Sequence, residues 1–347
     1  MKRITAVLLP LFILAAMMSG CDFPVDSTSN RADSAKDGKI SVVCTIFPLY
    51  DWVRQILGDR VDDVELTLLL NNNIDLHSYQ PTADDFVKIS VCDLFIYVGG
   101  ESDSWVNDAL KESVNKNMVI INLLRTLGDA AKEEEILEGM QEKCTDGEVE
   151  VGVEDKVEAE VEVKYEYDEH IWLSLKNARL FCSSIAGALS SLDADNATEY
   201  ENNLIAYTEK LSALDMEYTT VVNTATVRTL LFGDRFPFRY LLEDYNLTSY
   251  AAFPGCSAET EASFETVIFL ANKADDLGLE TILVTESSDK KIAETIISNT
   301  MDKNQRILVL DSAQSTTSND ASNGATYLAI MESNLDVLKK ALGDAQE

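Results

Sequence analysis

Two series of short apolar segments, each segment followed by a helix-like pattern, constrain the fold more than any other feature of the chain. The eight apolar segments are residues 40–46, 64–70, 92–98, 118–123, 227–232, 247–253, 281–285 and 306–310. Short, almost continuously apolar strands between helices are typical of a parallel sheet buried on both faces. We therefore predict an α/β fold with two similar (β/α)4-type lobes of four strands each.

The segment between the two series predicts one long helix. Residues 196–223 contain no Gly or Pro. Apolar side chains recur there at helical spacing, at Tyr200, Leu204, Tyr207, Leu211, Leu214 and Tyr218. We expect a rigid helix that joins an N-terminal lobe, residues 39–195, to a C-terminal lobe, residues 224–345.

The first residues have the pattern of an export signal. Lys2 and Arg3 precede an apolar run too short to span a bilayer comfortably, and small residues precede Cys21. This resembles the lipobox of bacterial lipoproteins, in which the cysteine is lipidated. The alternative is an ordinary cleaved signal with an incidental cysteine. Residues 22–38, rich in Ser, Asp and Asn, are predicted to form a flexible tether to an extracytoplasmic, soluble remainder.

The charge of the chain excludes one class of partner. A formal net charge of -32 repels the phosphates of nucleic acids. It is compatible with attraction of cations or with solubility alone. The segment 133–169 holds sixteen acidic and three basic residues. It forms either a mobile acidic insert or, where Val alternates with Glu, an exposed hairpin; self-repulsion favours the mobile insert.

Five cysteines follow Cys21, so at least one is unpaired within a monomer. Cys44 and Cys92 lie in apolar strand-like runs and are predicted to be small core residues. Spacing does not reveal whether any two cysteines form a disulfide.

The chain contains only two histidines, and each lies next to a predicted element. His77 follows the strand at 64–70 and precedes a helix that Thr82 is expected to cap. His170 directly precedes a helix expected at 174–192. Ligands of open α/β sheets bind at the C-terminal ends of strands, which makes His77 a candidate ligand. For an isolated loop histidine the alternative, an inert surface residue, is favoured until other motifs support binding.

Six motifs, in order and spacing, resemble the metal-specific solute-binding lipoproteins of ABC transporters, the cluster A-I family that delivers zinc or manganese. The motifs are residues 77–82, 168–173, 238–247, 258–263, 310–312 and 325–334. The resemblance covers nearly the whole mature chain. It implies two lobes around a long backbone helix, with a metal in the cleft between them. It also implies that His77 and His170 are ligands and that Asp311 supplies the final carboxylate.

The sequence departs from the family pattern at two positions. Glu169 stands where Pro is usual, and Arg235 stands where the family places a third ligand, His or Glu. A guanidinium has no lone pair to donate, so Arg235 is not a ligand. Asp234 is the candidate for that place, unless a water fills it. Arg235 is expected to pair with Asp311 or Glu286, and Glu286 is either a cleft carboxylate or, as we favour, a helix N-cap partner.

Two imidazoles with one or two carboxylates suit zinc, and also manganese or iron. We predict the extracytoplasmic binding component of an ABC transporter, a monomer that captures a divalent metal, zinc ahead of manganese, and delivers it to the membrane permease. The alternatives are a manganese or iron member of the family and an adhesin-like lipoprotein with weakened metal binding. Motifs of hydrolases, zinc proteases and phosphate loops are absent, so we do not expect an enzyme. Trp172 and Tyr79 are expected to pack beside the site.

Overall fold

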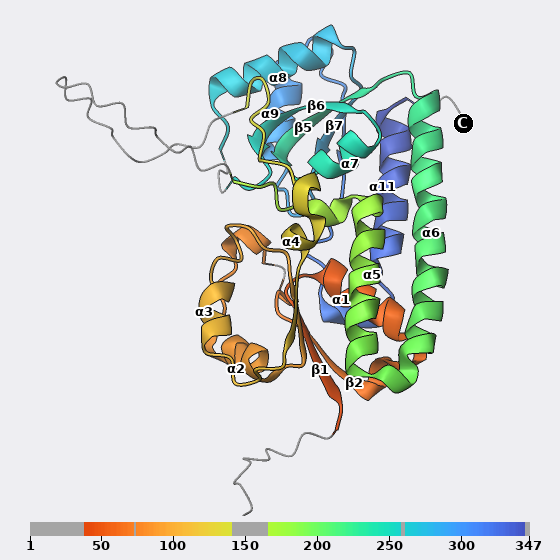
Figure 1. Cartoon of the computed structure of the whole chain (residues 1–347). Helices are drawn as coiled ribbons and strands as arrows, with labels where there is room; N and C mark the ends of the chain where they lie inside the picture. Colours follow the sequence, from red (N-terminus) through yellow and green to blue (C-terminus); the bar gives the residue numbers. More distant parts are fainter. Residues whose placement is uncertain (1–37, 73, 141–165, 258–260, 344–347) are drawn as a thin grey trace, which may run out of the picture. The chain divides into compact units, whose positions relative to one another are not determined.

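The computed structural model describes residues 38–72, 74–140, 166–257 and 261–343, and its helices and strands all belong to a compact unit that begins at Lys39. Two four-stranded parallel sheets organise this unit (Figure 1). The first has the order β2-β1-β3-β4, with β1 at Ile40–Cys44, β2 at Val64–Leu68, β3 at Leu94–Tyr97 and β4 at Val119–Asn122. The prediction of a parallel sheet buried between helices is confirmed for this lobe.

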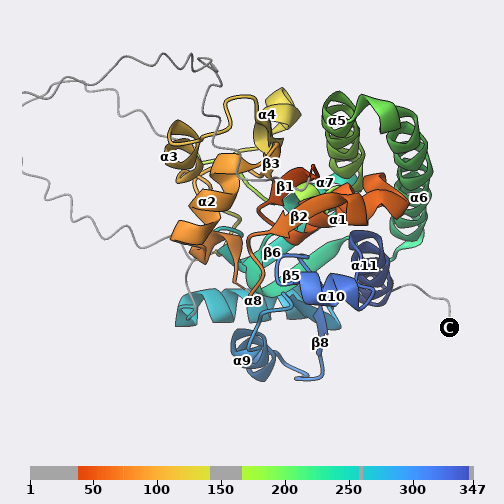
Figure 2. The same cartoon turned by 90° about the horizontal axis from the view of Figure 1, so that it is seen from below.

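Helices cover both faces of the first sheet. One face carries α2 (Ala83–Val91) and α3 (Val106–Lys111), and the other carries α1 (Phe47–Leu57) and α5 (Leu175–Leu192) (Figure 2). The short helix α4 (Leu123–Leu127) directly follows β4. The expected cap of α2 is present: Thr82 and Asp85 form a capping box, each side chain accepting a hydrogen bond from the other residue's backbone N–H.

The second sheet has the order β6-β5-β7-β8. Its strands are β5 at Thr229–Phe236, β6 at Thr248–Pro254, β7 at Thr281–Val284 and β8 at Arg306–Val309. Its helices are α7 at Arg239–Asp244, α8 at Phe264–Asp276, α9 at Lys291–Asn299, α10 at Ser318–Ser322 and α11 at Tyr327–Ala341. β5 extends beyond the predicted end at residue 232, because a register shift lets residues 235 and 236 pair with β6 again. Arg235 therefore lies at the end of a strand.

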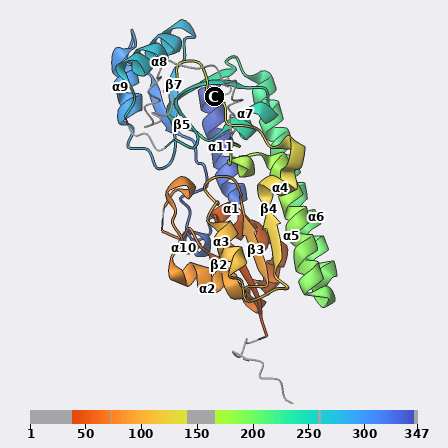
Figure 3. The same ribbon diagram turned by 60° about the vertical axis from the view of Figure 1, so that its left-hand side comes forward.

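The predicted joining helix is α6, at Ala197–Thr224, within one residue of the expected range. It packs against α5 and α1 of the first lobe and against α11, which follows the second sheet (Figure 3). Its buried face consists of Tyr200, Tyr207, Leu211, Leu214, Tyr218, Val221 and Val222. The two sheets thus share a helical layer that is more extensive than the single connecting helix predicted from sequence.

Buried hydrogen bonds fix α11 against the first lobe. The Asp51 carboxylate accepts from the backbone N–H of Tyr327 at 2.9 Å, and the Tyr327 hydroxyl donates to the carbonyl of Trp172 at 2.6 Å. The Trp172 indole N–H in turn donates to the carbonyl of Ser312 at 2.8 Å. These bonds hold the segment that follows His170 against the C-terminal part of the chain.

The signal sequence, Cys21 and the tether predicted for residues 1–37, and the part of the predicted acidic insert at 141–165, lie outside the described residues. Cys44 and Cys92 are fully buried, as expected for core residues, and Cys182 is fully buried as well. Among the described helices, none has both the length and the apolar composition that a bilayer span requires. The lobe limits at residues 195 and 224 stay predictions.

We predict that Tyr327→Phe lowers the free energy of unfolding by about 1–2 kcal/mol, because the buried Trp172 carbonyl loses its hydrogen bond. Urea unfolding of the metal-free chain measures this. Tyr97→Phe is the matched control, since the Tyr97 ring stacks on Phe95 and its hydroxyl has no hydrogen bond among the described residues. Equal losses in the two variants would contradict the structural role of the Tyr327 hydroxyl.

Candidate metal centre

His77 lies in a short 3-10 turn, Leu76–Ser78, that follows the first-lobe strand β2. The Asp75 carboxylate accepts the His77 backbone N–H at 2.9 Å and so fixes the start of the turn. From the second lobe, the Gln314 side-chain oxygen accepts the Leu76 backbone N–H at 3.3 Å. The His77 ring is thereby held where the C-terminal ends of the strands of both lobes meet.

His170 is fully buried immediately before a second 3-10 turn, Ile171–Leu173. One Asp168 carboxylate oxygen lies 2.9 Å from the His170 backbone N and 2.9 Å from its ring Nδ1. The Trp172 ring packs 5.2 Å from the His170 ring, centroid to centroid. The expected packing role of Trp172 beside the site is therefore confirmed.

The Nδ1 atom of His77 also faces polar groups. It lies 2.8 Å from the Ser102 hydroxyl oxygen and 3.4 Å from Oε2 of the Glu169 carboxylate. The Glu169 side chain is almost fully buried, and its Oε1 accepts the Ser102 backbone N–H at 2.9 Å. Gly100 makes room for it, because a Cβ at that position would lie 2.2 Å from Oε1. Each histidine thus has a carboxylate on its Nδ1 side, which orients the ring.

The two Nε2 atoms converge on one another at 3.1 Å. At this distance the two nitrogens share a proton, with the N–H of one ring donating to the lone pair of the other. Burial and the neighbouring His170 lower the pKa of His77 to about 3. Burial opposes the charge of His170, but the hydrogen bond and charge of Asp168 outweigh it and raise the His170 pKa. A metal ion can replace the proton between the two Nε2 atoms.

Cys256 is a nearby residue to which the sequence assigned no role. It follows β6 in the Pro254-Gly255-Cys256 turn. The ligand atoms of His77, His170 and Cys256 lie within 4.8 Å of one another, the one such triplet of possible metal ligands in the described part of the chain. The sequence places Cys256 directly after a strand, which is a common position for a ligand. It does not reveal the proximity of Cys256 to His77 and His170, because these residues are far apart in sequence.

The two predicted carboxylate ligands have other partners. Oδ2 of Asp234 accepts the backbone N–H of Thr285 at 3.1 Å and its hydroxyl at 2.7 Å, and Oδ1 accepts the Arg235 backbone N–H at 2.8 Å. Oδ1 of Asp311 accepts the Ala313 backbone N–H at 2.7 Å. Neither carboxylate belongs to the described triplet, so their role as ligands stays a prediction.

The expected role of Glu286 as a helix N-cap partner is wrong. Its carboxylate accepts the Ser312 backbone N–H at 2.8 Å and the Ser312 hydroxyl at 2.7 Å, whereas the N-cap of α9 is Lys290. Glu286 therefore fixes the loop that carries Asp311. Burial, followed by the charge of Glu286, raises the pKa of Asp311 to about 6.

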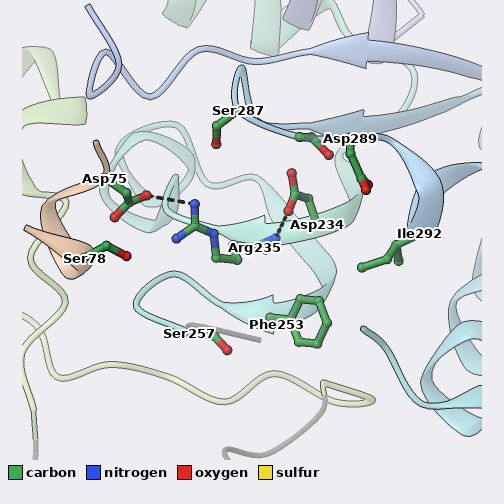
Figure 4. Close-up of a pocket in the computed structure, with 10 residues that line it drawn as sticks. Asp75, Ser78, Asp234, Arg235, Phe253, Ser257, Ser287, Asp289 and Ile292 are labelled. Carbon is green, nitrogen blue, oxygen red and sulfur yellow. Dashed lines mark hydrogen bonds and ion pairs between the residues drawn. The ribbon is translucent and has the colours of Figure 1, made fainter. Parts of the chain in front are cut away.

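The expected pairing of Arg235 with Asp311 or Glu286 is also wrong. Its guanidinium lies 2.8 Å from Oδ2 of Asp75 and joins the two lobes across a pocket of about 370 Å³ (Figure 4). Burial opposes the charge of Asp75, but Arg235 and then His77 hold the pKa of Asp75 below its usual range. Both carboxylate oxygens of Asp75 are thus engaged, one by Arg235 and one by the His77 turn.

A second pocket, of about 390 Å³, reaches His77. Its lining includes His77, Cys256 and the acidic residues Glu101, Glu166 and Glu169. Carboxylates along such a pocket raise the local concentration of cations. The site thus combines two converging imidazoles, a thiol and an acidic approach.

The chain is similar in sequence to a family of known proteins and to individual members of it. Residues 42–341 match the model of a family described as zinc-uptake complex component A, periplasmic. The chain is 29% identical over 335 residues to the high-affinity zinc uptake system protein ZnuA of Bacillus subtilis, covering 96% of this chain and 97% of that protein. It is 28% identical over 340 residues to the zinc-binding lipoprotein AdcA of Streptococcus pneumoniae, but spans only 61% of that protein's length.

Solved structures agree with the fold. The Zn(II)-bound ZnuA-like domain of Streptococcus pneumoniae AdcA superposes with a TM-score of 0.65 at 26% identity, over 88% of this chain and 99% of that one. The metal-dependent lipoprotein YcdH of Bacillus subtilis superposes with a TM-score of 0.66 at 26% identity, over 88% and 100%.

We predict that His77→Gln makes the metal-free chain less sensitive to acid. The folded-state pKa of His77 is about 3, below the ordinary value of 6.5, so only the unfolded chain takes up this proton between those values. The wild-type free energy of unfolding therefore falls as the pH falls through this range, by up to about 3 kcal/mol at pH 4 from this group alone. Urea unfolding at pH 7.5 and pH 4 checks this; an equal or larger acid loss in His77→Gln would contradict it.

Proposed function

Because the chain belongs to the family of zinc-uptake complex components A, we propose that it captures zinc outside the cytoplasm and delivers it to the membrane permease of an ABC transporter. The single observation that carries this proposal is the 3.1 Å approach of the His77 and His170 Nε2 atoms. Family membership assigns the chain to transport and not to catalysis.

The two imidazoles bind the metal through Nε2. The Nδ1 atom of His170 is held by Asp168, and that of His77 by Ser102 with Glu169 behind it. A carboxylate on the far nitrogen fixes the tautomer and makes the imidazole a better ligand. This arrangement places the metal at the position that the shared proton takes in the metal-free protein.

Zinc fits this donor set better than manganese. Imidazole nitrogen suits zinc, whereas manganese prefers carboxylate, carbonyl and water oxygens. Asp311 and Asp234 are the carboxylates that we predict from sequence to complete the site. Both oxygens of Asp234 already accept hydrogen bonds, from Thr285 and from Arg235, whereas among the described residues only Oδ1 of Asp311 does so, from Ala313. Both relatives described above are named for zinc, which supports the same choice.

The chain acts as a monomer anchored to the outer face of the cell membrane through a lipid on Cys21, with residues 22–38 as the tether. The name of one relative, a lipoprotein, supports the anchor. The net charge of -32 supports a cation as cargo and excludes nucleic acid as a partner.

Arg235 favours a second candidate function. Its positive charge lies close enough to lower the pKa of His77, and it disfavours a metal ion in the same way. A lipoprotein of this fold with weakened metal binding, serving as an adhesin, is therefore the rival proposal. Measured zinc affinity separates the two.

We predict that the wild-type chain, stripped of metal, binds one zinc ion in a calorimetric titration. His77→Ala and His170→Ala each remove a ligand and lower the affinity by on the order of 100-fold or more, and Asp168→Asn lowers it by about 10–100-fold through the orientation of His170. Asp84→Asn, at an exposed position in the first turn of α2, is the control and leaves binding unchanged.

Two outcomes of this titration would contradict the proposal. If wild type shows no zinc binding and zinc does not raise its melting temperature, the transport function is wrong and the adhesin candidate stands. If both alanine variants bind zinc as tightly as wild type, the histidine pair is not the site.

A further inference from the structure

We propose that Cys256 is a third protein ligand of the metal, bound as a thiolate, and that it sets the preference of the site for zinc over manganese. This inference rests on the proposed metal-capture function and names a ligand for the same site. It follows from three observations: the position of the turn that carries the thiol, its distance from the imidazoles, and the charge of the site.

The turn after β6 is held against His170. The Cys256 backbone N–H donates to a carboxylate oxygen of Glu134 at 3.0 Å, and the Ser257 backbone N–H donates to the Pro254 carbonyl at 3.2 Å. A Cβ on Gly255 would lie 2.9 Å from Cε1 of His170 and 2.8 Å from the Phe236 carbonyl oxygen. Glycine is therefore the residue that lets the turn reach the ring, and this close approach brings the next side chain to the metal position.

The distances suit a shared metal ion. Zinc bonds of 2.0–2.1 Å to nitrogen and 2.3 Å to sulfur, arranged tetrahedrally, separate two nitrogens by about 3.4 Å and a nitrogen from a sulfur by about 3.6 Å. The two Nε2 atoms are already 3.1 Å apart. The Cys256 sulfur lies within 4.8 Å of a ring nitrogen of each histidine, about 1 Å beyond the separation that a shared zinc ion requires.

An anionic ligand also suits the charge of a divalent ion. Two neutral imidazoles bring no negative charge into direct contact with the ion, and the carboxylates of Asp168 and Glu169 lie behind the rings on their Nδ1 sides. On binding, the S–H bond of Cys256 breaks, a sulfur–metal bond forms, and the proton passes to water. The resulting thiolate supplies one negative charge inside the first coordination sphere.

The sulfur–metal bond also accounts for the proposed preference for zinc over manganese. Thiolate is a soft ligand that favours zinc and cobalt, whereas manganese favours oxygen. Cys256 also lines the pocket of about 390 Å³ that opens onto His77 and Glu169, so an ion that enters there meets the thiol and the His77 imidazole together. A site with two histidines and one cysteine leaves a fourth position for water or a carboxylate.

The test uses Co²⁺ as a spectroscopic substitute for zinc in the reduced, metal-stripped full-length chain. We expect an intense near-ultraviolet sulfur-to-cobalt charge-transfer band in wild type and its loss in Cys256→Ser. Cys182→Ser is the matched control, because Cys182 is also a free cysteine but is buried in α5. We expect this variant to retain the band. We also expect Cys256→Ser to lower zinc affinity on the order of tenfold or more while manganese binding changes little.

A second measurement uses only the wild-type chain, so a folding defect in Cys256→Ser does not affect its result. Zinc should protect Cys256 from alkylation by iodoacetamide, read by mass mapping of the peptide that contains it. The ligand assignment is overturned if wild type binds Co²⁺ without the band, if Cys256→Ser keeps the band, or if zinc gives no protection. If wild type binds neither zinc nor cobalt, the metal-capture function itself fails, and this outcome differs from all the others.

Discussion

Two buried imidazole nitrogens at 3.1 Å must share either a proton or a metal ion, and the rest of the site follows from this constraint. The hydrogen-bond partners on the far nitrogens turn both Nε2 atoms inward, toward one shared position. In the metal-free protein a proton occupies that position. A divalent metal ion can occupy the same position and bind further ligands in addition to the two imidazoles.

The fold enforces this meeting by linking the two lobes around the site. The His77 turn is tied to Gln314 and, through Asp75, to Arg235, while the segment after His170 is tied to Ser312 and Tyr327. The shared helical layer of α1, α5, α6 and α11 holds the lobes from behind. Among these cross-links, the Asp75–Arg235 ion pair joins two charged side chains across the pocket.

The sequence predicted what is local or strongly periodic. Periodicity and capping residues are properties of the chain itself, so the sequence predicted the succession of strands, the limits of α6 and the Thr82 cap. It also singled out both histidines as candidate ligands, because the chain has only two. The partners of Arg235, Glu286 and Cys256 were not visible. Asp75 and Arg235 are separated by 160 residues, and only the packed fold brings them together. The extent of β5 was also missed, since a register shift depends on its neighbour strand.

Three unusual neighbours surround the histidine pair. Arg235 brings a positive charge paired with Asp75, whereas Glu169 and Cys256 place an acid and a thiol beside the histidines. Anomalous diffraction at the zinc edge, from crystals of the zinc-loaded chain, tests whether the two histidines share the ion. We expect one peak at bonding distance from Nε2 of both His77 and His170. A peak bonded to only one of them, or a peak elsewhere in the cleft, would contradict it.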